Sequence, residues 1–374
     1  MKFIDTFEYH RQHLKVTASE HIDNLGNELR ISLEGKTLIY LDTKYWVLLR
    51  DVVLGRTVET EIKQIYEYLS QLATNGMVLC PFSEDIFHEI IKQTDKETLE
   101  ASLSLIDKFS SGVSIRSLED RLKIEMLHLL ERYNEDSNTP KLESLIWTKL
   151  ANALGGLMIP TNTAFNKKDE LVMQKVFTDK LWSISLIELY GFIGFEKLQE
   201  FPHYPDFSTS MNEDYSERKD DFQSFHDVFM SEIEIDIERI LPEIEDVMAA
   251  AYHRETGNIL EAEEKKDTRI IQNIIYNTFK FKKEGDNLRS MNVACGLSAA
   301  IWWNEKQKYK KNDFYDIGHA QAAIPYCDYF FTEKYIKHVV TTEPLKYDKK
   351  FKCKVLANPK EILEVLESIS QQTN

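Results

Sequence analysis

Short apolar runs, each followed by a helical pattern, occur toward both ends of the chain. They are residues 37–42 (TLIYLD), 77–80 (MVLC), 329–332 (YFFT) and 352–357 (KCKVLA). After the last run, Asn358 is placed to cap a helix and Pro359 to occupy its first position. Short buried strands that alternate with helices are typical of a parallel sheet covered on both faces. The pattern therefore predicts an α/β fold with a three-layer core around a parallel sheet.

The middle of the chain has a different pattern. From 116 to 289 apolar residues recur with the helical period, as in SLEDRLKIEMLHLLERY, and no alternating strand pattern is evident. The polar, mixed-charge stretch 208–224 predicts a loop. These patterns predict a helical N-terminal segment at 1–35, an α/β core formed by 36–115 and 290–374, and a mostly α-helical insertion at 116–289.

Composition indicates an ordinary globular protein. The 374 residues are 43% hydrophobic and 29% charged, and no apolar stretch approaches the ~20 residues that span a membrane. The N-terminus lacks the apolar core of a secretory signal. The four cysteines form no C-x-x-C pair, which argues against a disulfide framework and a thiolate zinc site. We therefore expect a cytoplasmic protein without a membrane partner.

The net charge of −16 argues against a broad surface that coats nucleic acid, because such affinity comes mostly from lysine and arginine. It does not exclude a nuclease, since a metal ion can supply positive charge locally.

Asp42 directly follows the first apolar run, at the predicted carboxyl end of a strand. Open parallel sheets bind ligands outside the carboxyl ends of their strands, and a buried carboxylate is costly unless its charge is compensated. Aspartate is also a preferred N-cap, so Asp42 is equally expected to cap the helix that follows. Both roles remain open from the sequence.

The second run leads into PFSEDIFHEIIKQ at 81–93. Ser83 suits the N-cap, and Glu84 and Asp85 suit the first turn, where the helix dipole favours anions. Glu89 shares a helical face with Ile86, Ile90 and Gln93. A carboxylate beside an apolar stripe usually has a partner, which is either a basic side chain or a metal.

The third segment is NDFYDIGHAQAAIPYCDYFFTEK at 312–334. Asn312 is placed to cap a helix that ends near Pro325, and Asp313 and Asp316 share a face in its first turn. The helix dipole is again an alternative explanation for both acids. The strand that follows ends in Thr332 and Glu333, which adds a further acid at a strand end. His319 is expected to be packed rather than to bind a ligand.

Asp42, Glu89, Asp316 and Glu333 are all expected near one edge of the predicted sheet. Converging carboxylates repel one another, and a divalent cation removes that penalty. A ligand set made only of oxygen favours Mg²⁺ or Mn²⁺ over zinc.

Together these segments resemble the PIN-like domains, a large group of metal-dependent ribonucleases. The resemblance covers roughly 36–110 and 290–374 and rests on IYLDTKYWVLL, SEDIFHE and the segment 312–334. It implies that Asp42, Glu89 and Asp316 are catalytic acids that bind Mg²⁺ or Mn²⁺, with Asp313 as an alternative to Asp316. Glu333 stands near a fourth acidic position, where the family often has aspartate.

The expected activity is metal-assisted hydrolysis of phosphodiester bonds, with RNA favoured over DNA as the substrate. Thr43, Ser83 and Thr332 are candidates to orient water or phosphate oxygens, and Lys44 is a candidate to contact a phosphate.

Two other functions are compatible with parts of the sequence. A haloacid dehalogenase-type phosphatase also begins with a strand and an aspartate, but needs a second aspartate where this chain has Lys44. A catalytically inactive interaction protein is the other alternative. Its acids would cap helices, and its helical insertion would bind a regulatory protein or a second copy of the chain.

Overall fold

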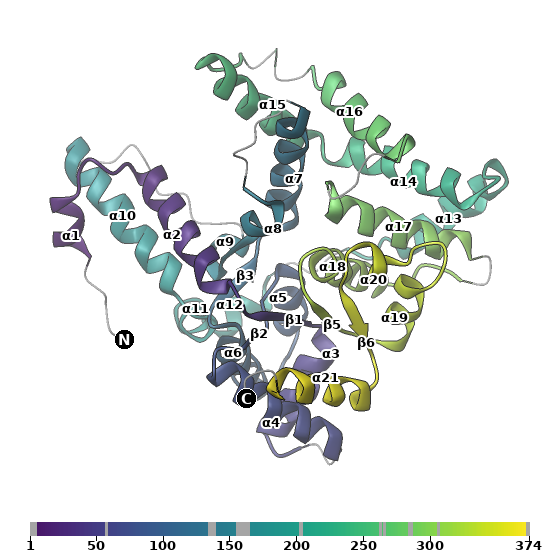
Figure 1. The fold of residues 1–374 in the computed structure, drawn as a ribbon, viewed down its shortest axis with the longest axis horizontal. Helices are drawn as coiled ribbons and strands as arrows, with labels where there is room; N and C mark the ends of the chain where they lie inside the picture. The colour runs from purple at the N-terminus through teal and green to yellow at the C-terminus, as the bar shows by residue number, and fades with distance from the viewer. Residues whose placement is uncertain are drawn as a thin grey trace. The chain divides into compact units, whose positions relative to one another are not determined.

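The computed structural model is mostly helical, with short strands, and Figure 1 traces its elements along the chain. It describes residues 6–56, 59–133, 140–154, 165–201, 205–261, 264, 267–282, 287–304 and 307–371. The chain divides into two compact units. Unit 1 comprises Met1–Ser117, Trp147–Pro202 and Asn358–Asn374, and unit 2 comprises Leu118–Ile146 and His203–Ala357.

Unit 1 contains four of the strands and eleven of the helices in the described residues. Its elements are α1 (Phe7–Gln12), α2 (Ala18–Leu33), β1 (Thr37–Leu41), α3 (Thr43–Val53), α4 (Thr60–Thr74), β2 (Val78–Leu79), α5 (Glu84–Ile90), α6 (Lys96–Ser110), β3 (Val113–Ile115), β4 (Trp147–Lys149), α9 (Leu150–Ala153), α10 (Lys167–Ser183), α11 (Leu186–Ile193), α12 (Phe195–Gln199) and α21 (Pro359–Gln371).

Unit 2 is built mainly from helices. Its elements are α7 (Leu118–Tyr133), α8 (Leu142–Leu145), α13 (Ser208–Arg218), η1 (Lys219–Asp221), α14 (Phe225–Arg239), α15 (Leu241–Thr256), α16 (Arg269–Lys280), α17 (Arg289–Trp303), α18 (Asp313–Ala323), β5 (Tyr329–Phe331), α19 (Lys334–Thr341), α20 (Tyr347–Lys350) and β6 (Lys354–Leu356).

Each unit holds one pair of parallel strands. In unit 1, β1 runs parallel to β2, with Thr37 opposite Val78. In unit 2, β5 runs parallel to β6, with Phe330 opposite Val355. The parallel strands are short and almost wholly apolar, as expected for strands that are covered on both faces.

The core of unit 1 lies around β1. Ile39, Tyr40 and Leu41 are all fully buried, and α3 packs against α4 and α6. The last helix of the chain, α21, packs against α4 (Figure 1). Its Ile362 and Leu366 are buried at the spacing that defines one helical face.

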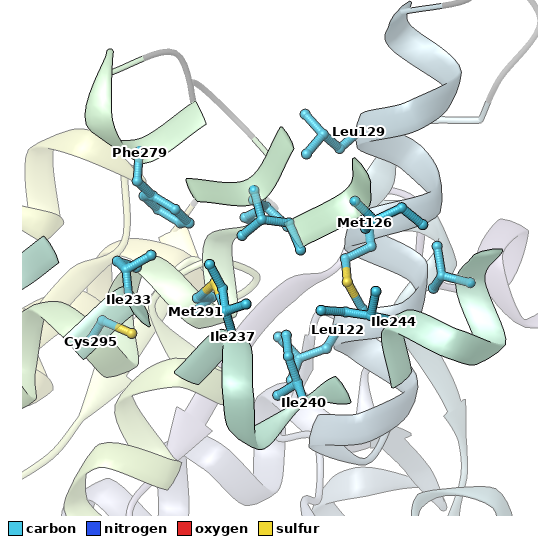
Figure 2. Packing of buried hydrophobic residues seen from close by; sticks show 14 of the residues in the cluster. Leu122, Met126, Leu129, Ile233, Ile237, Ile240, Ile244, Phe279, Met291 and Cys295 are labelled. Carbon is cyan, nitrogen blue, oxygen red and sulfur yellow. The ribbon is translucent and has the colours of Figure 1, made fainter. Parts of the chain in front are cut away.

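The core of unit 2 is a cluster of buried side chains from α7, α14, α15, α16 and α17 (Figure 2). Its labelled members are Leu122, Met126, Leu129, Ile233, Ile237, Ile240, Ile244, Phe279, Met291 and Cys295. Fully burying a large apolar side chain stabilises a fold by roughly 1.5–3 kcal/mol, so this cluster is the main source of cohesion among these helices.

The coarse α/β expectation is confirmed, since the structure combines many helices with four parallel strands at the four predicted apolar runs. The three-layer PIN-like arrangement and the division into 1–35, 36–115 with 290–374, and 116–289 stay predictions. No helix in the described part of the chain combines the length and apolar character needed to span a membrane.

Two local predictions were wrong. The predicted insertion contains a strand, β4, which pairs antiparallel with β3 so that Ser114 lies opposite Thr148. The stretch 208–224 is not a loop throughout, because α13 occupies Ser208–Arg218. This helix buries none of its residues, so its sequence needs no apolar stripe. Without that stripe the helical pattern is not visible in the sequence.

Candidate functional site

Asp42 lies directly after β1 and is only 5% exposed. Its Oδ1 accepts a hydrogen bond of 3.0 Å from the backbone N–H of Lys44, so Asp42 is the N-cap of α3. The capping role that the sequence left open is therefore present. An ionised carboxylate has two oxygens and several lone pairs, so capping by Oδ1 is compatible with a second role as a ligand.

A hydrogen bond joins β1 to the segment that follows the neighbouring strand β2. The hydroxyl oxygens of Tyr40 and Ser83 lie 2.6 Å apart, and both side chains are buried. Ser83 also caps α5, since its Oγ accepts from the N–H of Ile86 at 3.4 Å. The start of α5 is thus held against β1, the strand that Asp42 directly follows.

Helix α5 carries two acids of interest. Glu89 is half-buried beside Ile86 and Ile90, which agrees with the predicted face, but α5 ends at Ile90 and Gln93 lies beyond it. Asp85, in the first turn, is only 4% exposed. Asp85 needs no functional role on sequence grounds, because the helix dipole already accounts for an acid in a first turn. Its burial makes it a site candidate that the sequence did not reveal.

In unit 2, Asp313 and Asp316 begin α18. Asp313 is buried and Asp316 is half-buried. Burial raises the pKa of Asp313, although the N–H of Lys310 donates to its Oδ2 at 2.8 Å and opposes the rise. Asn312 occupies the N-cap position without a side-chain capping bond, contrary to the prediction that it caps this helix.

Tyr335 in α19 lies close to both of these aspartates. Its burial and the negative charges of Asp313 and Asp316 raise the pKa of its phenol to about 12. A neutral phenol beside two carboxylates can donate a hydrogen bond to an acid or to a phosphate oxygen. No pattern in the sequence marked Tyr335.

The remaining candidates differ in accessibility. Thr332 is fully buried at the end of β5, and its N–H donates to the carbonyl of Leu356 at 2.9 Å. Glu333 is exposed at the N-cap position of α19. Lys44 is exposed and Thr43 is half-buried at the start of α3. Of these, Lys44 and Glu333 are accessible to solvent.

The sequence-predicted residues therefore form two groups. Unit 1 carries Asp42, Thr43 and Lys44 directly after β1, Ser83 at the start of α5 and Glu89 in the last turn of that helix. Unit 2 carries Asp313 and Asp316 near Tyr335, together with Thr332 and Glu333 at the end of β5. His319, expected to be packed, is buried.

No protein-family model, curated protein or solved structure matches this chain.

Proposed function

We propose that this protein is a metal-dependent nuclease, an endoribonuclease rather than a DNase, whose Mg²⁺ or Mn²⁺ is bound in unit 1 by Asp42 and Glu89. Asp316 and Glu333, in unit 2, stay predictions from the sequence. The observation that carries the proposal is the burial of Asp42 directly after a parallel strand. That position is where open parallel sheets bind their ligands. A buried charge there requires compensation, and a hard cation provides it.

The donor set fits the ion. Every candidate ligand is a carboxylate, and the neighbouring hydroxyls of Thr43 and Ser83 add further oxygen donors. Oxygen-only sets suit Mg²⁺ and Mn²⁺, and Mg²⁺ usually retains several waters beside one or two carboxylates. This leaves coordination positions for a phosphate oxygen and for water.

A divalent ion bound here supplies a water of lowered pKa and stabilises charge on the leaving oxygen. The chain's own residues have separate tasks. Asp42 would hold the ion, and Glu89 or Asp85 would accept the proton that the attacking water loses. Lys44, exposed beside Asp42, contacts a phosphate of the substrate strand. Water adds to phosphorus, the bond to the leaving oxygen breaks, and that oxygen takes up a proton.

The test is cleavage of labelled single-stranded RNA and DNA by the purified chain with Mn²⁺ or with EDTA. Asp42→Asn removes the charge but keeps the N-cap of α3, because asparagine caps helices as well as aspartate does. Asp316→Asn tests the second group, and Asp23→Asn, at an exposed position of α2, is the charge-matched control.

We expect RNA cleavage that requires the metal and falls at least 100-fold in both site variants, since even outer-shell partners of a metal contribute about 10–100-fold. Asp23→Asn should retain wild-type activity. Cleavage at the normal rate by Asp42→Asn in Mn²⁺ would show that this aspartate is not a ligand.

A second candidate function is a protein-binding scaffold. Large apolar side chains are exposed on residues 165–201 of unit 1, namely Phe165, Met173, Phe177, Phe192 and Phe201. Contiguous exposed apolar surface marks interaction sites, and these side chains are candidates to contribute to one. If the chain is such a scaffold, Mg²⁺ titration should show no binding beyond that of the Asp42→Asn variant, and no RNA cleavage should occur.

A further inference from the structure

Two histidines converge on one aspartate in unit 1. His10 Nε2 lies 2.7 Å from Asp179 Oδ2, and His21 Nε2 lies 2.6 Å from Asp179 Oδ1. The three residues come from α1, α2 and α10, and Figure 1 shows these helices side by side. The chain separates the aspartate from the histidines by 169 and 158 residues, so the cluster exists only through folding.

The three side chains have the composition and the spacing of a metal site. Two imidazoles and one carboxylate form a donor set found in zinc proteins, with zinc–ligand bonds of about 2.0–2.2 Å. The donor atoms all lie within 4.8 Å of one another. The two rings meet edge to face with centroids 4.7 Å apart, which lets both Nε2 atoms face the same carboxylate. We propose that His10, His21 and Asp179 bind a zinc ion, at a site separate from the carboxylate site proposed for catalysis.

The helices that carry these residues are tied together independently of the cluster. The side chain of Lys175, one turn before Asp179 on α10, is buried, and its Nζ donates to the carbonyls of His13 at 2.8 Å and Val16 at 3.0 Å. Thr17 and Glu20 form a capping box at the start of α2. The backbone of the α1–α2 connection is therefore partly restrained by contacts that involve no metal, which reduces the entropy lost on binding.

The cluster also has a route for an ion and room for a further ligand. The side chain of His10 is 2% exposed, but those of His21 and Asp179 are 14% and 18% exposed. Three protein ligands leave a fourth tetrahedral position, which water or an anion can occupy from the solvent side.

Zinc binding changes the protons of the cluster in a defined way. In the hydrogen-bonded state each Nε2 that contacts Asp179 carries the shared proton. To bind zinc, each Nε2 must present its lone pair, so the proton moves to Nδ1 in a neutral ring or leaves to solvent from an imidazolium.

The consequence for the fold concerns α1. A six-residue helix is not stable alone, because nucleating a helix is unfavourable and short helices recover little of that free energy. A zinc ion held jointly by α1, α2 and α10 would fix it in place. Zinc removal should therefore loosen the N-terminal helices without involving Asp42.

The test uses the whole chain, stripped with chelator and titrated with ZnCl₂ by calorimetry, with bound zinc measured by elemental analysis after dialysis. Wild type should retain one zinc per chain, and His21→Ala should bind it at least 100-fold more weakly. His13→Ala is the matched control, since His13 lies in the same region but its Nδ1 contacts the carbonyl of Tyr9 rather than Asp179.

Two further variants keep the test decisive. His21→Gln retains a side-chain N–H donor for Asp179 but is a poor zinc ligand, so it separates loss of metal from loss of the hydrogen bond if His21→Ala unfolds. Asp42→Asn should retain zinc fully even where RNA cleavage is lost. The proposal fails if wild type binds no zinc at micromolar concentration, or if His21→Ala or the folded His21→Gln binds it as tightly as wild type.

Discussion

The hydroxyl of Tyr40 lies 2.6 Å from the hydroxyl of Ser83, and this contact connects β1 to the segment that follows β2. Tyr40 comes two residues before Asp42, and Ser83 comes two residues before Asp85. Both hydroxyls belong to buried side chains, which makes their pairing important, because an unpaired buried polar group costs free energy. The contact thus holds together the two segments that carry the buried acids Asp42 and Asp85.

Tyr40→Phe should lower the free energy of unfolding by about 1–2 kcal/mol, since it removes one partner from a buried pair. Urea unfolding followed by circular dichroism measures the change. Tyr68→Phe is the control, because the hydroxyl of Tyr68 contacts Glu367 only in an exposed pair at 3.4 Å. Equal losses in the two variants would mean that the Tyr40–Ser83 contact adds nothing specific.

Asp85→Asn should reduce metal-dependent RNA cleavage at least 100-fold if this buried acid serves the proposed site, since outer-shell partners of a metal already contribute about 10–100-fold. Glu84→Gln is the matched control, since Glu84 is in the same turn but is more exposed. Initial rates at saturating Mn²⁺ provide the comparison. Identical rates in the two variants would remove Asp85 from the site and leave Glu89 as the acid of α5.

Glu232 in α14 predicts a pH dependence of stability. Burial, together with the nearby charge of Asp236, raises the pKa of Glu232 to about 7, from 4.5 as the ordinary value. The folded state holds the proton of Glu232 more tightly than the unfolded state does. The contribution of this group to the free energy of unfolding is therefore greatest below about pH 4.5 and falls as the pH rises through 7. The loss for this group amounts to about 3 kcal/mol at 1.36 kcal/mol per pKa unit.

Glu232→Gln should abolish this part of the pH dependence and make the protein more stable than wild type at pH 8. Glu238→Gln, on the same helix but exposed, should leave the wild-type profile unchanged. Thermal unfolding at pH 5, 6.5 and 8 measures both. A wild-type midpoint that rises steadily from pH 5 to pH 8 and is unaffected by Glu232→Gln contradicts the prediction.

Gly296 in α17 leaves room for Tyr347. A Cβ at position 296 would lie 1.8 Å from the Tyr347 hydroxyl, which donates to the carbonyl of Asn292 at 2.7 Å. Gly296→Ala should therefore destabilise the protein by about 1–3 kcal/mol despite the better helix propensity of alanine. Gly26→Ala in α2, where a Cβ meets nothing within 4 Å, should instead be neutral or stabilising. Adding Tyr347→Phe to Gly296→Ala should restore part of the lost free energy of unfolding, as measured by chemical denaturation.

The four parallel strands were predictable because their signals are local. Each combines a short apolar run with the cap of the following helix or a turn, and the caps at Asp42, Ser83 and Asn358 form the expected side-chain hydrogen bonds. Strands β3 and β4 were not predictable, since each has three residues and its stability comes from pairing Val113 with Lys149, far along the chain. Helix α13 escaped prediction because it buries no side chain.

The candidate site was only partly readable from the sequence. The position of Asp42 follows from the strand pattern, and the face that carries Glu89 follows from helical spacing. The burial of Asp85 and the proximity of Tyr335 to Asp313 depend on packing between distant segments, which no local pattern encodes. The pairing of His10 and His21 with Asp179 has no local signal either.

The packing of α21 on α4 has a consequence for protein synthesis. A ribosome that has delivered residues up to Ala357 has made every segment of unit 2, but the helix that covers α4 has yet to emerge. Unit 1 is thus translated in three stages, and the two segments of unit 2 are made between them. Nascent chains that stall before Asn358 expose the apolar face of α4, which makes them targets for chaperones and proteases.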